Sequence, residues 1–152
     1  MHSRRSALFF AGALALAPMV VTAPAFALKP PAPELQEVLI KASLLTFNDA
    51  NVTGNYSVLH AKLSKPFRDQ FPPEKLKEGF KAFSDAHIDF DIVVAKPPVL
   101  TEPVKVDDNG RLALRGYFDT RPSRVHYDLS FIMSEGEWKL INLSVNVKPV
   151  EE

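Results

Sequence analysis

Few side chains in this sequence have the type and spacing that catalysis or metal binding requires. Beyond residue 27 the chain contains three histidines, His60, His87 and His126, and the sequence has no cysteine. None of the three lies at a short metal-ligand spacing from another, so the pattern typical of zinc sites is absent. No glycine-rich phosphate loop and no serine in a nucleophile-elbow context occurs either. The sequence therefore predicts no metal site and no cofactor.

His60 is the strongest candidate for acid–base chemistry. It follows Tyr56 by about one helical turn and lies beside apolar residues, which predicts a position inside the folded domain. A neighbouring carboxylate would complete a pair for proton transfer, and Asp49 and Asp119 are the candidates for it. A buried histidine that only hydrogen-bonds locally fits the same pattern, and that second interpretation is favoured.

A second set of polar side chains lies on two adjacent segments that alternate between polar and apolar residues. On a sheet, these side chains would share the face opposite the apolar stripes. They could hold a polar ligand, or they could form solvated cross-strand charge pairs worth well under about 1 kcal/mol each, which is the favoured interpretation. The set consists of Arg115, Tyr117, Asp119, His126 and Asp128.

The first 27 residues are typical of a cleavable secretory signal peptide. Arg4 and Arg5 precede an apolar run of about 15 residues, Ala7–Val21, and small residues lead up to Ala27. A membrane-spanning helix needs about 20 apolar residues, so the anchor interpretation is weaker. We expect cleavage after Ala27 and a protein of the periplasm or the extracellular medium. The general secretory route is favoured over the twin-arginine route, which stays open.

The remainder of the chain has the composition of one soluble domain. Residues 28–33 are proline-rich and predict an extended lead-in, and residues 34–149 have the length of a single domain. Basic and acidic residues number 18 each, so without Arg4 and Arg5 the chain carries a net charge of −2. This balance gives no electrostatic reason to bind nucleic acid or to associate with an anionic membrane.

Helical periodicity fills the first half of the domain. Helices are predicted over residues 34–51 and 55–63 and from Pro73 onwards, with a turn near Pro66 between them. Glycine at position 79 of the third helix suggests that a neighbour packs closely there. The apolar face of the first helix is predicted to consist of Leu35, Val38, Leu39, Ala42 and Leu45.

Alternation replaces helical periodicity after residue 86. Strands are predicted over residues 90–94, 104–106, 112–118, 125–133 and 138–147. Asp107–Gly110 and the segment 134–136 are hairpin turns, because each contains the glycine that such turns favour. Helices first and antiparallel strands afterwards predict an α+β fold, in which the N-terminal helices pack on one face of a curved antiparallel sheet.

The last predicted strand has apolar residues on both faces. Strict alternation places Trp138 and Leu140 with Asn142 and Ser144, and it places five mainly aliphatic residues on the opposite face. Three helices cover only one face of a sheet, so the second face needs another cover. A second copy of the chain is the expected cover, which predicts a homodimer through the outer sheet face. A C-terminal tail folded over a central strand is the alternative.

The closing segment Gly136–Leu143, GEWKLINL, resembles the Gly-x-Trp-Lys-(Ile/Leu) ending of the nuclear transport factor 2-like superfamily. The order of elements along the chain resembles that superfamily as well. The resemblance implies a cone-shaped α+β roll, a fold shared in outline with the cystatins. Its members include isomerases, dehydratases, scaffolds and toxin-immunity factors. The thin strand signal between the second and third helices departs from the family pattern and leaves the early strand order open.

In such folds the cone between helices and sheet often holds a small apolar ligand. The resemblance thus favours a cofactor-free binding or accessory module with a small apolar cavity. The alternatives are a cofactor-free isomerase or dehydratase, and a module that binds another protein of the cell envelope. The polar residues Asn142 and Ser144, which follow Trp138, suggest that the cavity widens and is solvated at that end. The candidate lining residues are Tyr56, His60, Phe80, Tyr127, Trp138, Asn142 and Ser144.

Overall fold

A computed structural model describes residues 28–151, and the predicted signal peptide lies outside these residues. Within them all helices precede the main strands, and the strands form an antiparallel sheet that does not close. This confirms the predicted α+β class. No helix in the described range has both the length and the apolar character needed to cross a membrane.

The helical part consists of one long helix and several short ones. The long helix α1 begins with a proline in its first turn and ends at Gly54, which adopts a left-handed conformation with φ of 71°. Prolines also occupy the first turns of α3 and α4. The helices are α1 (Pro33–Thr53), α2 (Ser57–Lys62), α3 (Lys65–Gln70), α4 (Pro73–Gly79), α5 (Lys81–Asp85) and the 3₁₀ helix η1 (Asp91–Ala95).

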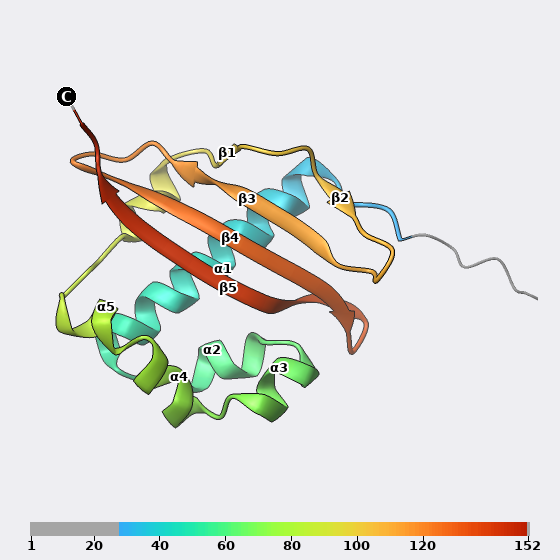
Figure 1. Cartoon of the computed structure of the whole chain (residues 1–152), viewed down its shortest axis with the longest axis horizontal. Coiled ribbons are helices and arrows are strands. Elements are labelled where there is room, and N and C mark those ends of the chain that lie inside the picture. Colours follow the sequence, from blue (N-terminus) through green and yellow to red (C-terminus); the bar gives the residue numbers. More distant parts are fainter. Residues whose placement is uncertain (1–27, 152) are drawn as a thin grey trace, which may run out of the picture.

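The sheet is a meander of three long strands with two short pieces at one edge. The hydrogen-bonded order is β1-β3-β4-β5, and β2 pairs with the same edge of β3 as β1 does (Figure 1). The turn between β4 and β5 has positive φ at both Glu135 and Gly136, as a tight two-residue hairpin requires. The strands are β1 (Val99–Leu100), β2 (Lys105–Val106), β3 (Leu112–Phe118), β4 (Ser123–Ser134) and β5 (Glu137–Pro149).

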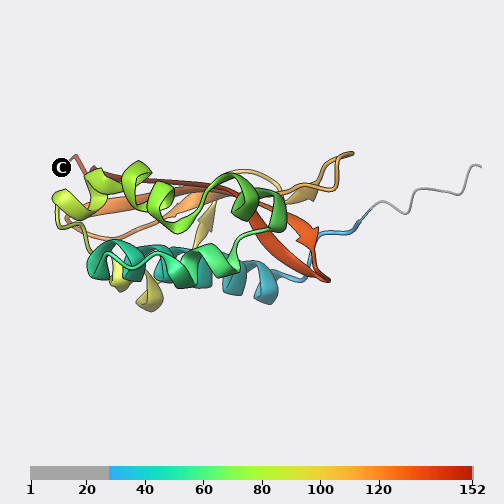
Figure 2. The same cartoon turned by 90° about the horizontal axis from the view of Figure 1, so that it is seen from below.

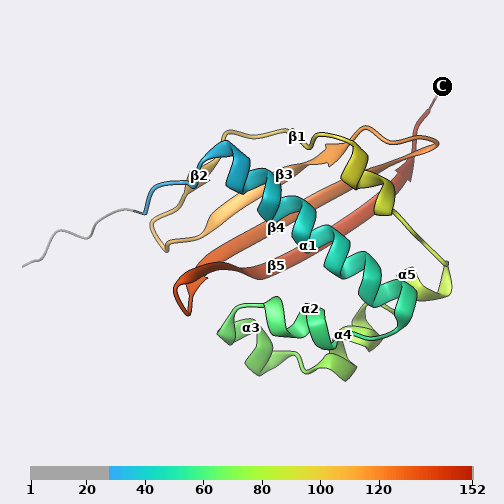
Figure 3. The same ribbon diagram turned by 180° about the vertical axis from the view of Figure 1, so that it is seen from behind.

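The helices occupy one face and one edge of the sheet. Helix α1 crosses one face, where it lies behind the strands in Figure 1 and in front of them in Figure 3. The short helices α2 to α5 lie along the β5 side (Figures 1 and 2). In the described part of the chain, no helix covers the other face of the sheet. We call it the outer face.

Helix α1 covers the sheet with a different stripe from the one that we predicted. Ile40, Leu44 and Phe47 are at most 1% exposed and belong to the core between helices and sheet, whereas Leu35 is 43% and Val38 57% exposed. Leu39 and Leu45 of the predicted face are partly buried against the core, so the predicted face was wrong for Leu35, Val38 and Ala42. The helix carries two apolar stripes, and spacing within one helix does not tell which stripe meets the sheet.

A β-bulge in β5 overturns the predicted faces of the last strand. Ser130 pairs with Asn142 but the next residue, Phe131, pairs with Leu140, so Ile141 is an extra residue. The bulge brings Trp138 and Leu140 to the same side of the sheet as Leu143, Val145 and Val147. These five apolar residues face the helices, while Asn142, Ser144 and Asn146 lie on the outer face. The homodimer stays a prediction, but β5 does not present the aliphatic outer face on which we based it.

The segment that we predicted as a first strand, residues 90–94, is the 3₁₀ helix η1. Phe90 and Val93 are 2% and 0% exposed, while Ile92 and Val94 between and after them are more than half exposed. Spacing of three residues, which matches a 3₁₀ turn, therefore defines the buried side. The side-chain oxygen of Asn48 on α1 accepts a 2.9 Å hydrogen bond from the Phe90 backbone N–H and fixes this turn.

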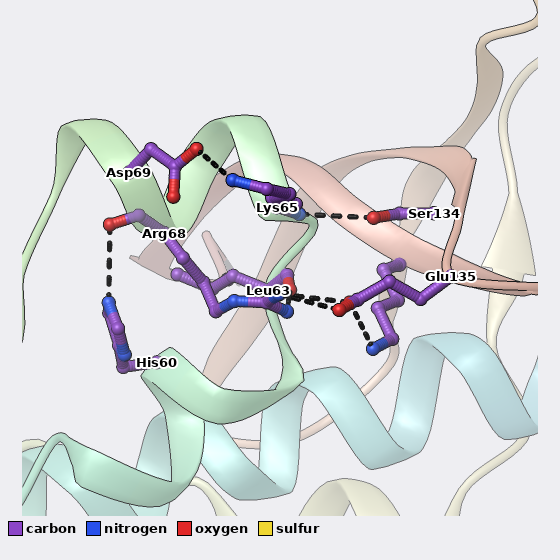
Figure 4. Close-up of polar contacts among 8 residues, drawn as sticks. His60, Leu63, Lys65, Arg68, Asp69, Ser134 and Glu135 are labelled. Carbon is purple, nitrogen blue, oxygen red and sulfur yellow. Dashed lines mark hydrogen bonds and ion pairs between the residues drawn. The ribbon is translucent and has the colours of Figure 1, made fainter.

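The start of α3 is tied to the β4–β5 turn by several polar contacts (Figure 4). The Arg68 guanidinium donates to both carboxylate oxygens of Glu135, at 3.0 and 2.9 Å, and to the Leu63 carbonyl oxygen at 2.7 Å. The Lys65 backbone N–H donates to Ser134 Oγ at 3.1 Å. We call the Arg68–Glu135 pair and these neighbours the turn clamp. It joins the short helices to the sheet.

Candidate functional site

An apolar groove of about 260 Å³ lies between α1, α2 and the β4–β5 hairpin. Its walls are mostly apolar, and the single tryptophan of the chain forms part of one wall. The lining residues are Val38, Leu39, Ala42, Ser43, Thr46, Leu59, Ala61, Lys62, Phe131, Glu137, Trp138, Lys139 and Leu140.

The second apolar stripe of α1 forms one wall of this groove. Val38, Leu39 and Ala42 follow one another at helical spacing; Val38 and Ala42 are exposed, and Leu39 is partly buried against the core. The opposite wall is the beginning of β5, where Trp138 is half-buried and Leu140 is 3% exposed. Both of these side chains point toward the helices because they lie on the inner face of the sheet before the bulge.

Three charged side chains line the groove. The Lys62 ammonium donates a 2.9 Å hydrogen bond to Thr46 Oγ1 and has no ion-pair partner among residues 28–151. Lys139 forms a 2.8 Å ion pair with Glu135 of the turn clamp. Glu137 is exposed and forms no ion pair within the described range. The groove thus offers one cation that a ligand could neutralise, on its helical wall.

Of the residues that we predicted to line a cavity, Trp138 lines the groove. Tyr56 and Phe80 instead stack in the core, with ring centroids 6.4 Å apart. Tyr127 is 4% exposed and also belongs to the core. Burial raises the pKa of its phenol above the ordinary value. These aromatic side chains fill the space between helices and sheet, where the family resemblance implied a ligand.

Asn142 and Ser144 lie on the outer face rather than beside Trp138, because the bulge separates them from it. The Asn142 side-chain amide donates to the Asp128 carbonyl oxygen at 3.1 Å. Ser144 is exposed and borders a shallow hollow of about 240 Å³ on the outer face.

The three predicted acid–base residues do not form a hydrogen-bonded pair in the described structure. His60 Nε2 lies 3.3 Å from the Arg68 carbonyl oxygen, so the ring contacts backbone (Figure 4). Asp49 borders a separate cavity of about 400 Å³ next to α1. Asp119 binds Arg121 and Arg124 at 2.7 and 2.9 Å, and these hydrogen bonds lower the pKa of its carboxyl. His60 is part-buried rather than buried, and its polar contact is with the backbone eight residues further along the chain.

The polar set of the outer face comes together largely as the alternation predicted. Arg115 lies 3.0 Å from Glu102 and 3.0 Å from Asp128, so two carboxylates already neutralise its charge. His126 packs beside Tyr117 with ring centroids 5.7 Å apart. Cross-strand pairs of this kind fit the solvated face better than a ligand site.

No group of three or more histidine or carboxylate side chains suited to a metal ion occurs among residues 28–151.

Sequence reasoning missed most of the groove. Lys62, Thr46 and Leu59 were not singled out as site residues, and α1 residues of the groove wall were assigned to the core. One signal was present: apolar residues occupy more of the circumference of α1 than a single sheet contact can bury. The position of α2 opposite β5, which completes the groove, depends on tertiary contacts far apart in the sequence.

The fold and groove define the class of protein only in structural terms: an α+β domain whose helices cover one face of an open antiparallel sheet. No protein-family model, curated protein or solved structure matches the chain.

Proposed function

We propose that this protein is a cofactor-free binding module that takes a small apolar ligand into the groove between α1, α2 and β5. The observation that supports the proposal best is the second apolar stripe of α1. Val38 is 57% exposed at the groove, although burial of a valine or leucine side chain typically stabilises a protein by about 1.5–3 kcal/mol. An apolar ligand would bury this surface.

The dimensions of the groove favour a small ligand. Its volume of about 260 Å³ lies just below the range of about 300–1,000 Å³ that is usual for drug-sized molecules. At about 30 Å³ per water-sized group, that volume holds about nine such groups. A linear alcohol of eight carbons, 1-octanol, is therefore a suitable probe.

Trp138 provides a direct measurement, because it is the single tryptophan of the chain and lines the groove. Protein purified after expression of the full chain should show a saturable change of tryptophan emission on titration with 1-octanol. Calorimetry of the same titration should give one binding site.

Two variants, each with one alanine replaced by phenylalanine, make a matched pair for this experiment. Ala42→Phe places a ring in the groove and should abolish the response, whereas Ala82→Phe changes an exposed alanine of α5 that does not line the groove. Ala82→Phe should bind as the unaltered protein does. Binding of octanol that survives in Ala42→Phe, or no binding in the unaltered protein, contradicts the proposal.

We also propose that the protein acts outside the cytoplasm and belongs to the nuclear transport factor 2-like superfamily. Export is supported by the residue pattern of positions 1–27, and membership by the element order and the GEWKLINL ending. Export is tested by the mass of the protein recovered from its native compartment, which should correspond to a chain that begins at Leu28. A mass that includes residues 1–27 contradicts cleavage.

A further inference from the structure

The groove pairs its apolar walls with one cation that is hydrogen-bonded to the groove wall. Lys62 is the last residue of α2 and is exposed, and its ammonium donates a 2.9 Å hydrogen bond to Thr46 Oγ1 of α1, a residue that also lines the groove. A lysine ammonium can donate three hydrogen bonds, and Thr46 is its single side-chain partner in the described part of the chain. It can therefore bind an anionic oxygen without giving up this contact.

The other charged groups near Lys62 do not neutralise it. Asp49 borders the neighbouring cavity, which Lys62 and Thr46 also line, and no ion pair joins Asp49 to Lys62. On the strand wall, Lys139 is paired with Glu135, at 2.8 Å. Glu137 is the one unpaired anion on the groove among the described residues, and no side-chain hydrogen bond holds it in place.

We propose that the ligand is a small amphiphile with an anionic head group, and that Lys62 binds that head group while the tail lies against Trp138 and α1. This inference rests on the proposed function, because it names the chemical class of ligand for the same groove. Lys62 supplies charge complementarity through an ammonium that is hydrogen-bonded to the groove wall, whereas the unpaired Glu137 on the opposite wall disfavours an anion there.

The test compares octanoate with 1-octanol, two probes of equal chain length that differ in head-group charge. Lys62→Gln should weaken octanoate binding about two- to fivefold, the range expected for one charge pair near the surface, and should leave octanol binding unchanged. Glu137→Gln, a matched neutralisation on the other wall, should keep octanoate binding or strengthen it. Lys62→Arg should keep most of the octanoate affinity. Thermal unfolding of each variant shows that it is folded.

The outcomes separate this inference from the proposed function. If both probes bind and Lys62→Gln weakens neither or both equally, the head-group inference is wrong while the apolar groove stands. If neither probe binds the unaltered protein, both proposals fail. A loss of octanoate affinity in Lys62→Gln that leaves octanol binding intact supports the inference, because a merely structural effect would weaken both probes.

Discussion

Two tyrosine side chains are buried in the core, and only one of their hydroxyls has a hydrogen-bond partner in the described structure. The Tyr56 hydroxyl donates to Asn51 Oδ1, and the same asparagine donates through Nδ2 to the Phe47 carbonyl oxygen at 3.0 Å. The Tyr127 hydroxyl has no hydrogen-bond partner in the described structure. A buried hydroxyl without a partner costs about 1–3 kcal/mol, and a satisfied one contributes about 1 kcal/mol.

Replacing each tyrosine by phenylalanine should therefore change stability in opposite directions. Tyr127→Phe should raise the free energy of unfolding by about 1 kcal/mol, because it removes an unsatisfied polar atom. Tyr56→Phe should lower it by about 1–3 kcal/mol, because it leaves Asn51 without its partner. Urea unfolding of both variants measures the difference. A less stable Tyr127→Phe protein would mean that the hydroxyl has a partner after all.

Two glycines make a second contrasting pair at this scale. A Cβ added to Gly116 would collide with the Val99 carbonyl oxygen and lie 2.7 Å from the Tyr127 hydroxyl. Gly79 has no atom within 4 Å of the added Cβ, so the close neighbour that we expected there is absent. Gly79 is the last residue of α4, and Phe80 separates it from α5.

We predict that Gly116→Ala lowers the free energy of unfolding by about 1–3 kcal/mol, because β1 must move away from β3 to admit the methyl group. Gly79→Ala should instead raise it by about 0.4–1 kcal/mol, through the reduced entropy of the unfolded chain. The midpoints of urea unfolding measure both. Equal effects of the two substitutions would contradict the close approach of Val99 to Gly116.

At the scale of elements, the bulge in β5 decides which side chains build the groove and which face solvent. Because side chains alternate along a strand, one extra residue reverses the faces of everything that follows it. Removing Ile141 would make the sequence from Trp138 to Val147 alternate without interruption, and every inward residue would stay inward. The bulge is therefore a local insertion in an otherwise regular strand.

We predict that deletion of Ile141 leaves a folded protein, with a loss of stability within the range of about 0.5–3 kcal/mol that is usual for single changes. Deletion of Ser144 is the control. Although Ser144 is exposed, its loss must turn either Leu143 or both Val145 and Val147 toward solvent. At about 1.5–3 kcal/mol per exposed side chain, that variant should be the less stable of the two. The reverse order of stability would exclude the register described above.

Strand β5 and its neighbours show which features of the fold could be predicted from the sequence alone. The turns at Asp107–Gly110 and Ser134–Gly136 and the strands beside them were predicted because turn chemistry and alternation are local properties. The faces of β5 were predicted wrongly, because assigning faces by strict alternation assumes that the strand contains no bulge. The core stripe of α1 was also missed, because its two apolar stripes are distinguished by what packs against them. Of the groove, Trp138 was predicted, while Lys62 depends on the approach of α2 to β5.

At the scale of the whole molecule, short helices and sheet are joined beside the groove. The Ser64 backbone N–H donates to the Leu140 carbonyl oxygen at 2.8 Å, and Leu63 forms an isolated bridge with the same residue of β5. The turn clamp lies next to this bridge, and its central carboxylate, Glu135, binds both Arg68 and Lys139. Binding of these two cations to one carboxylate makes the junction sensitive to acid.

Hydrogen bonds from Lys139 and Arg68 hold the pKa of the Glu135 carboxyl below its ordinary value. The folded carboxyl thus has a lower pKa than the unfolded one, which is about 4.3. Its contribution to stability is complete above that pH and is lost as the pH falls through the lower folded pKa. We therefore expect the free energy of unfolding to decrease as the pH falls below about 4.3, in part because the turn clamp loses the charge of Glu135.

Glu135→Gln tests this contribution by removing the titrating group. The variant should be less stable than the unaltered protein at pH 7, and the difference should shrink as the pH falls below about 4, because the protonated clamp already lacks the charge. Glu137→Gln is the matched control, since Glu137 has no ion pair within residues 28–151. Urea unfolding at pH 7 and pH 3 measures each difference. If Glu135→Gln lowers the free energy of unfolding equally at both pH values, the turn clamp stabilises the fold through packing rather than charge. The acid sensitivity of the fold would then come from other groups.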